Sequence, residues 1–179
     1  LITLTFQLTA SLLQPWVGYH TDRHPKPWLL PAGTVCTLIG ILMMSVVSSF
    51  PMILLAAGLI GVGSSTFHPE ASRVARLASG GRFGLAQSTF QVGGNAGSAF
   101  GPLLAAAIII PYGQGHVAWF GLFALFALFV LYRISRWYAN HLNLFKLKQG
   151  QTATHGLSKG RVISALVVLG LLVFSKYFY

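Results

Sequence analysis

Six long apolar segments make up most of this sequence, and almost all of its charged residues lie between them. The segments cover residues 1–17, 28–47, 52–67, 85–110, 117–132 and 162–179. Only Lys176, one of fourteen charged residues, lies within a segment. A helix that crosses a bilayer needs about 17–25 mostly apolar residues, which these segments supply when the shortest take in polar neighbours. The pattern predicts an all-α polytopic membrane protein with six transmembrane helices.

The charges indicate how these helices are oriented. Connectors 18–27, 68–84 and 133–161 together hold eleven Lys and Arg residues, whereas connectors 48–51 and 111–116 hold none. Cytoplasmic loops of membrane proteins carry an excess of Lys and Arg, so we expect the three basic connectors in the cytoplasm. The net charge of +10 then reflects membrane topology, and no nucleic-acid partner is expected. With only 8% charged residues, against roughly 25% in soluble domains, the composition argues strongly against a soluble globular enzyme.

The longest connector divides the chain into unequal parts. Residues 133–161 are polar and basic, which predicts a cytoplasmic linker. It separates five segments within residues 1–132 from a single segment at 162–179. The chain begins without Met, and apolar segments lie at both of its ends. We therefore expect a fragment of a longer protein.

Two stripes of residues at four-residue spacing run along segment 85–110. One stripe consists of amides, namely Gln87, Gln91 and Asn95. The other consists of glycines, namely Gly93, Gly97 and Gly101, followed by Pro102. Amides are costly in lipid, so they are expected either to line an aqueous substrate path or to hydrogen-bond between helices. The glycines are expected to allow close helix packing, and the proline a bend.

Glycines and a lysine distinguish two further segments. Gly58, Gly61 and Gly63 lie within segment 52–67, where close helix packing is the expected role. Lys176 lies deep in the last segment, where a charge usually faces a cavity. It is expected either to attract an anionic substrate or to extend to the membrane interface.

The connectors contain two groups of polar residues that suggest chemistry. Glu70 follows Pro69, which favours the start of a short interfacial helix with a Glu70–Arg73 ion pair at i, i+3. Proton carriage by Glu70 is the alternative. The residues His20, Asp22 and His24 resemble metal ligands, but no second histidine cluster accompanies them. No metal and no cofactor are therefore expected. No nucleophile, base and orienting group occur together, so no enzymatic activity is expected either.

The first connector resembles a signature of the major facilitator superfamily. Its motif runs from Gly18 through Asp22 and Arg23 to Lys26, as between helices 2 and 3 of that family. The glycine–proline run ending at Pro102 is similar to the fifth helix of its proton-coupled exporters. Stretches 64–75, 78–82, 84–88, 90–95, 134–138 and 174–179 also resemble a drug exporter of this superfamily, so the resemblance covers the whole chain.

The resemblance implies a bacterial inner-membrane exporter of which this chain forms helices 2–7 of twelve. The implied activity is proton-coupled efflux of fosmidomycin-like phosphonate drugs by alternating access between two helix bundles. The implied partners are the lipid bilayer, protons, a small-molecule substrate of anionic character and the remaining helices of the same protein. The implied conformational latch consists of Gly18, Asp22, Arg23 and Lys26. An importer of a small solute is the alternative within the family, and a membrane-embedded enzyme or scaffold is the alternative outside it.

Overall fold

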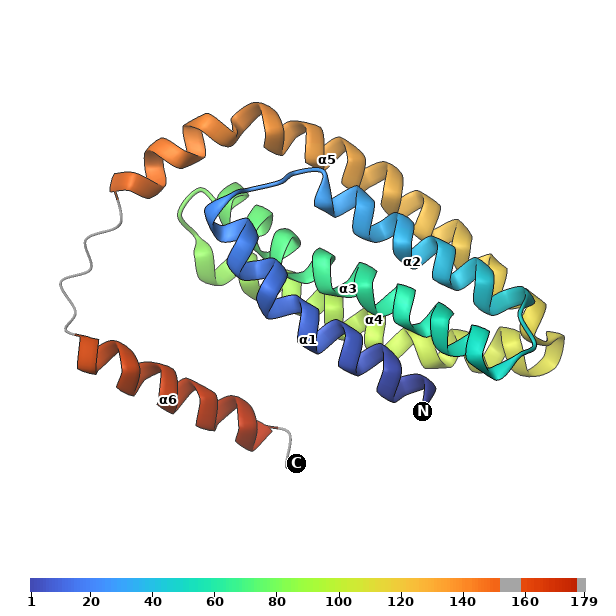
Figure 1. Cartoon of the computed structure of the whole chain (residues 1–179). Helices are drawn as coiled ribbons and strands as arrows, with labels where there is room; N and C mark the ends of the chain where they lie inside the picture. Colours follow the sequence, from blue (N-terminus) through green and yellow to red (C-terminus); the bar gives the residue numbers. More distant parts are fainter. Residues whose placement is uncertain (152–158, 177–179) are drawn as a thin grey trace. The chain divides into compact units, whose positions relative to one another are not determined.

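The computed structural model of the chain describes residues 1–151 and 159–176, and these residues form six α-helices and no strand. The helices are α1 (Ile2–Arg23), α2 (Leu29–Val46), α3 (Phe50–Ala78), α4 (Phe83–Tyr112), α5 (Ala118–Gln151) and α6 (Lys159–Lys176) (Figure 1). A short 3-10 helix, η1 (Gln114–Val117), links α4 to α5. The chain divides into two compact units, Leu1–His141 and Leu142–Tyr179, which are treated separately. The predicted all-α class is confirmed.

Four helical stretches are long and apolar enough to cross a membrane. They are Leu29–Val46, Phe50–Ala78, Phe83–Tyr112 and Gln114–Leu142. The helix α1 has 22 residues, and its polar residues include Gln7, Ser11 and Gln14, which make it less apolar than these four stretches. In α6, the apolar stretch within the described residues is Gly160–Leu172.

The helix α3 differs most from the sequence expectation. A separate interfacial helix beginning at Pro69 was predicted, but α3 continues through Pro69 to Ala78. A proline inside a helix costs about 3 kcal/mol. Here α3 packs along both α1 and α2, and these contacts stabilise the continuous helix. The helix α5 likewise continues beyond residue 132 to Gln151, so the first part of the predicted linker is helical.

Glycines allow α3 to pack closely against two helices at once. Gly63 faces Gly33 of α2, and a Cβ added at Gly63 would lie 3.0 Å from the backbone nitrogen of Thr37. Gly61 faces α1, where an added Cβ would lie 2.8 Å from the carbonyl oxygen of Phe6. Real Cβ atoms essentially never approach within 3.0 Å of such atoms. The predicted close packing of segment 52–67 is therefore confirmed at Gly61 and Gly63.

The helix α4 contacts the rest of its unit near its two ends. Near its start, the rings of Phe90 and Phe67 of α3 lie 6.5 Å apart. Beyond its other end, the side-chain amide of Gln114 in η1 donates hydrogen bonds to the carbonyl oxygens of Met44 and Val47 at 2.8 and 2.7 Å. Residues 91–100 between these contacts are all exposed.

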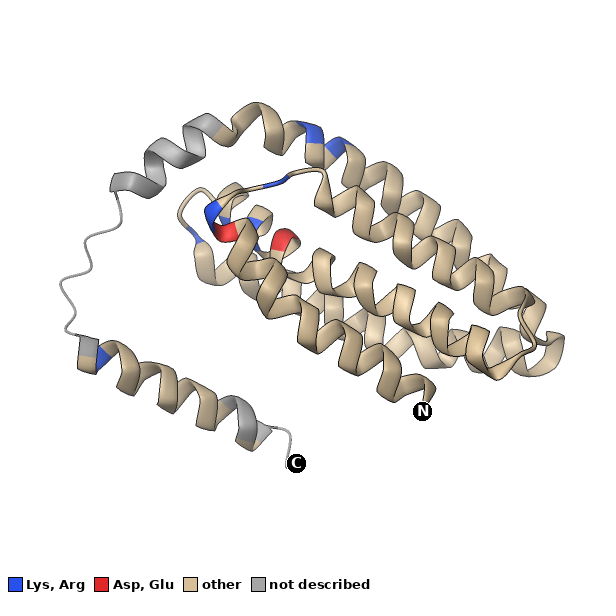
Figure 2. Ribbon diagram, in the orientation of Figure 1, with Lys and Arg blue, Asp and Glu red and all other residues tan. Residues whose placement is uncertain are grey.

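The charged residues of the first unit gather at one end of its helices. Figure 2 shows the Lys, Arg, Asp and Glu residues of this unit where α1 ends, where α2 begins, where α3 connects to α4, and on the part of α5 that contains Arg133 and Arg136. The opposite end, which contains the α2–α3 connection and η1, has none of them. Within this unit, the residues of the basic connectors, which alternate with uncharged connectors along the sequence, thus lie together at one end, and the uncharged connectors lie at the other.

Candidate functional site

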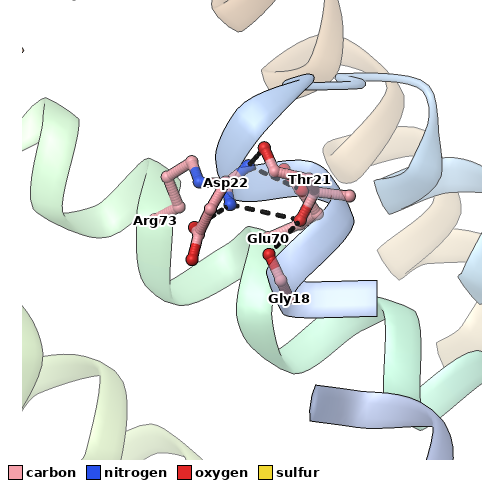
Figure 3. A network of polar contacts seen from close by, with 5 residues as sticks. All are labelled: Gly18, Thr21, Asp22, Glu70 and Arg73. Atoms are coloured by element: carbon pink, nitrogen blue, oxygen red, sulfur yellow. Dashed lines mark hydrogen bonds and ion pairs between the residues drawn. The ribbon is translucent and has the colours of Figure 1, made fainter. Parts of the chain in front are cut away.

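A cluster of polar side chains joins α1 to α3 at this charged end. We call Thr21, Asp22, Glu70 and Arg73 the Arg73 cluster, because the guanidinium of Arg73 contacts the other three residues (Figure 3). Its Nη1 donates to Glu70 Oε1 at 2.8 Å and to the Thr21 carbonyl oxygen at 2.7 Å. Its Nη2 donates to Thr21 Oγ1 at 3.1 Å and to Asp22 Oδ1. One arginine side chain therefore connects two helices.

Burial differs sharply among the three charged members of the cluster. The side chain of Glu70 is 0% exposed, that of Arg73 12% and that of Asp22 73%. Arg73 therefore lies between a buried carboxylate and one in contact with solvent. Because two carboxylates share one guanidinium, the cluster carries a net negative charge when both are ionised.

The buried carboxylate is only partly satisfied. Glu70 Oε1 accepts the hydrogen bond from Arg73, but Oε2 is buried and has no hydrogen-bond partner among the described residues. The Thr21 hydroxyl lies beside this carboxylate, but the hydrogen bond that it donates goes to the Gly18 carbonyl oxygen at 3.3 Å. An unpaired buried oxygen is costly, since it loses its interaction with water and gains none in return.

Local sequence explains why these residues meet. Glu70 and Arg73 stand at i, i+3 on α3, a spacing that places side chains on the same helix face. Asp22 and Thr21 lie in the last turn of α1, beside that face. A Cβ on Gly18 would lie 3.8 Å from Pro69 Cβ, which is ordinary contact. Gly18 therefore takes part through its carbonyl group, and its lack of a side chain is not required for space here.

The helix α5 supplies a residue that the sequence did not single out. Tyr138 is 1% exposed, and its phenol interacts with Arg73 and with the charge of Glu70. One turn earlier, the Ser135 hydroxyl donates to the Pro27 carbonyl oxygen at 2.8 Å. These two residues share a face at i, i+3, but they stand at the start of a segment predicted to be a linker. Nothing in that segment indicated a buried contact.

The structure places the four residues of the predicted latch differently from one another. Asp22 pairs with Arg73 of α3, and the neighbouring Arg23 instead lies over the ring of Tyr19, 4.1 Å from its centroid. Lys26 lies in the connector, where its carbonyl oxygen accepts from the Leu29 amide at 3.0 Å. Only Gly18 and Asp22 of that set contact the Arg73 cluster. The predicted ion pair between Glu70 and Arg73 is present at 2.8 Å.

The amide and glycine stripes of α4 have few contacts within the described residues. Gln87 Oε1 accepts a hydrogen bond from the Ser72 hydroxyl of α3 at 3.0 Å, whereas Gln91 and Asn95 are exposed. No described atom lies within 4 Å of a Cβ added at any of the three stripe glycines, Gly93, Gly97 and Gly101. Close packing by these glycines therefore remains a prediction about contacts beyond this part of the chain. Pro102 lies inside α4.

Two sequence features outside the cluster lead to no further site. The backbone of α6 ends at Lys176, but the side chain of Lys176 lies outside the described residues. The rings of His20 and His24 lie 5.5 Å apart. Over the part of the chain that the structure describes, His, Cys, Asp and Glu form no group of three that could hold a metal ion.

The chain is similar to known proteins along its whole length. Residues 1–179 match the family model of the Major Facilitator Superfamily. The chain is 59% identical over 179 residues to the fosmidomycin resistance protein of Escherichia coli, a match that covers 100% of this chain and 44% of that protein. It is 42% identical over 171 residues to YfnC, an uncharacterized MFS-type transporter of Bacillus subtilis, with coverage of 94% and 42%. The chain thus spans less than half the length of both relatives, and no solved structure matches it.

Proposed function

Because this chain belongs to the Major Facilitator Superfamily, we propose that the protein containing it exports phosphonate drugs such as fosmidomycin in exchange for protons. The observation that supports this proposal is the 59% identity, over the full chain, to a fosmidomycin resistance protein. The apolar helices with charges gathered at one end fit a membrane transporter. A transporter moves its substrate unchanged, so we assign no catalytic residues.

Transport direction and coupling are tested in inverted membrane vesicles that contain the full-length protein. A proton gradient, acid inside, should drive uptake of radiolabelled fosmidomycin into these vesicles, and a protonophore should abolish the uptake. Cells that produce the protein should also tolerate more fosmidomycin. Increased sensitivity of the cells would instead indicate an importer, and the proposed direction would then be wrong.

We further propose that the charged end of the first unit faces the cytoplasm, because Lys and Arg are retained on that side. In a cysteine-free background, a cysteine at Ser79 should be protected from an impermeant thiol reagent in intact cells, whereas one at Gly115 should react. Gly115 suits this test, since no described atom lies within 4 Å of a Cβ added there. Labelling at Ser79 with protection at Gly115 would reverse the proposed orientation.

In the mechanism that we propose, the Arg73 cluster stabilises one of the alternating conformations by joining α1 to α3. The amides of α4, Gln87, Gln91 and Asn95, would line the substrate path. Lys176 would attract the phosphonate group, since an ammonium can act as a point charge for such an anion. Gly93, Gly97, Gly101 and Pro102 would serve packing and bending of α4 against the remaining helices.

Asp22→Asn should slow transport without lowering membrane abundance. Asp22 is 73% exposed, and exposed ion pairs contribute about 0–1 kcal/mol, so folding should be unaffected. Arg73 also keeps its bonds to Glu70 and Thr21. A loss of up to 1 kcal/mol in one conformation alone would change the ratio of conformations by up to about fivefold. The measurement is the initial rate of fosmidomycin uptake in vesicles.

The matched control for this prediction is Arg23→Gln. Arg23 is adjacent in sequence but lies over Tyr19 rather than in the cluster, so its replacement should slow uptake less. Normal kinetics for Asp22→Asn together with slow uptake for Arg23→Gln would show that the latch does not depend on the Asp22–Arg73 pair.

A further inference from the structure

The buried carboxylate of Glu70 is the most unusual charged group that the structure describes. It is fully removed from solvent, one of its oxygens is unpaired, and its one cation is shared with Asp22. Building on the proposed exchange of drug for protons, we propose that Glu70 is a proton-binding site that is loaded and emptied once per transport cycle. Proton binding forms an O–H bond on the carboxylate and removes its negative charge.

The surroundings of Glu70 favour a group that changes its protonation state. The groups that face it are Thr21 and Asp22 from α1, Arg73 from its own helix and Tyr138 from α5. Burial opposes the ionised carboxylate, and Arg73 favours it. These opposing effects are similar in kind to those that poise acids in proton-transfer sites. A proton on Oε2 would neutralise the cluster without displacing Arg73 from Oε1.

The same geometry makes access to Glu70 depend on conformation. Solvent reaches Asp22 and the edge of Arg73, but not Glu70. The guanidinium of Arg73 lies between the carboxylate of Glu70 and the solvent-exposed Asp22. On this side of the cluster, a proton can therefore pass between Glu70 and water only when α1 and α3 separate or when Arg73 moves aside. Protonation weakens the Arg73–Glu70 ion pair, which lies within α3, and so makes it easier for Arg73 to move aside. Because the same guanidinium joins α3 to Thr21 and Asp22 of α1, this movement couples proton binding to the conformational change.

Two assays on the purified full-length transporter in proteoliposomes separate coupling from transport itself. Counterflow measures exchange of labelled for unlabelled fosmidomycin without a gradient, and it needs no net proton movement. Gradient-driven accumulation needs a proton for each cycle. Glu70→Gln, which resembles the protonated form, should retain counterflow. Accumulation of fosmidomycin by Glu70→Gln should fall to the level that is seen without a proton gradient.

Two further variants serve as controls. Asp22→Asn removes the exposed carboxylate of the same cluster but leaves Glu70 able to bind a proton. It should slow transport in both assays alike, and gradient-driven accumulation should still exceed the level that is seen without a gradient. Glu70→Asp keeps a carboxyl group but places it one methylene further from Arg73. It should retain coupled transport with the pH midpoint of accumulation displaced from that of the wild type.

Each outcome decides for or against the proposal. Gradient-driven accumulation by Glu70→Gln with a wild-type pH profile overturns it, as does loss of counterflow at normal abundance, which would indicate a structural role. If Glu70→Gln does not reach the membrane, the pH midpoint of Glu70→Asp decides, and an unchanged midpoint overturns the proposal. Failure of counterflow in the wild-type protein is a different result. It would show that the protein does not transport fosmidomycin, and the proposed function, rather than the role of Glu70, would then be wrong.

Discussion

Gly63→Ala should sharply lower the stability and membrane abundance of the protein, although it adds a single methyl group. The new Cβ would lie 3.0 Å from the backbone nitrogen of Thr37 and would collide with the Gly33 carbonyl oxygen and the Thr37 hydroxyl. Two of these atoms belong to the α2 backbone, so they cannot move aside by rotating a side chain. The helices must separate, and overpacking of this kind costs roughly 1–3 kcal/mol, occasionally more.

Gly58→Ala is the matched control, because it makes the same change on the same helix. The atom nearest to a Cβ at Gly58 is Thr5 Cγ2 at 4.0 Å, which leaves room for a methyl group. Alanine also favours a helix by about 0.8–1.0 kcal/mol over glycine, so this variant should be as stable as the wild type or more stable. The measurement is the midpoint of thermal unfolding of each variant, monitored by size-exclusion chromatography of heated samples. Equal stability of both variants would contradict the close α2–α3 approach.

Arg73→Gln should destabilise the protein strongly by leaving Glu70 buried without a cation. Removing one partner of a buried ion pair costs about 3–5 kcal/mol, because the other charge remains in a nonpolar environment. The variant also loses the bond to the Thr21 carbonyl oxygen, so α1 and α3 lose their main polar link at this end. The expected result is a large drop in the midpoint of thermal unfolding.

The double variant Arg73→Gln, Glu70→Gln tests the cause of that drop. Neutralising both groups removes the buried charge, so most of the lost stability should return. Arg76→Gln is the control for loss of an arginine on the same helix, since the Arg76 guanidinium lies over the Phe83 ring outside the cluster. A double variant no more stable than Arg73→Gln alone would mean that the unpaired charge of Glu70 is not the source of instability.

Much of the fold could be predicted because a membrane imposes simple rules on a sequence. Apolar segments of sufficient length with charges confined to the connectors predicted the helices, since a buried backbone must satisfy its own hydrogen bonds. Helix ends were less predictable. The break expected at Pro69 does not occur, because packing of α3 against α1 and α2 outweighs the local cost of proline. Contacts of that kind have no counterpart in the local sequence.

The candidate site was only partly predictable for a related reason. Glu70 and Arg73 could be paired from their i, i+3 spacing, because a helix alone brings them together. The pairing of Asp22 with Arg73 joins residues 51 positions apart and depends on how α1 meets α3. Tyr138 lies still further along the chain, and only the fold brings it to the cluster. Sequence spacing likewise did not distinguish Gly63, which contacts a neighbouring helix, from Gly97, which has open space around it.

The exposed middle of α4 has a consequence for how natural variation in this protein should be interpreted. Residues 91–100 make no buried contact within their own unit, and the helix is held near its ends by Phe90 and through η1. Substitutions in this stretch leave the packing of α1, α2 and α3 intact. Any intolerance to substitution there therefore reports on what α4 meets elsewhere, whether other helices or the transported molecule. A map of tolerated substitutions along α4 would thus identify that surface without any need for a ligand-bound structure.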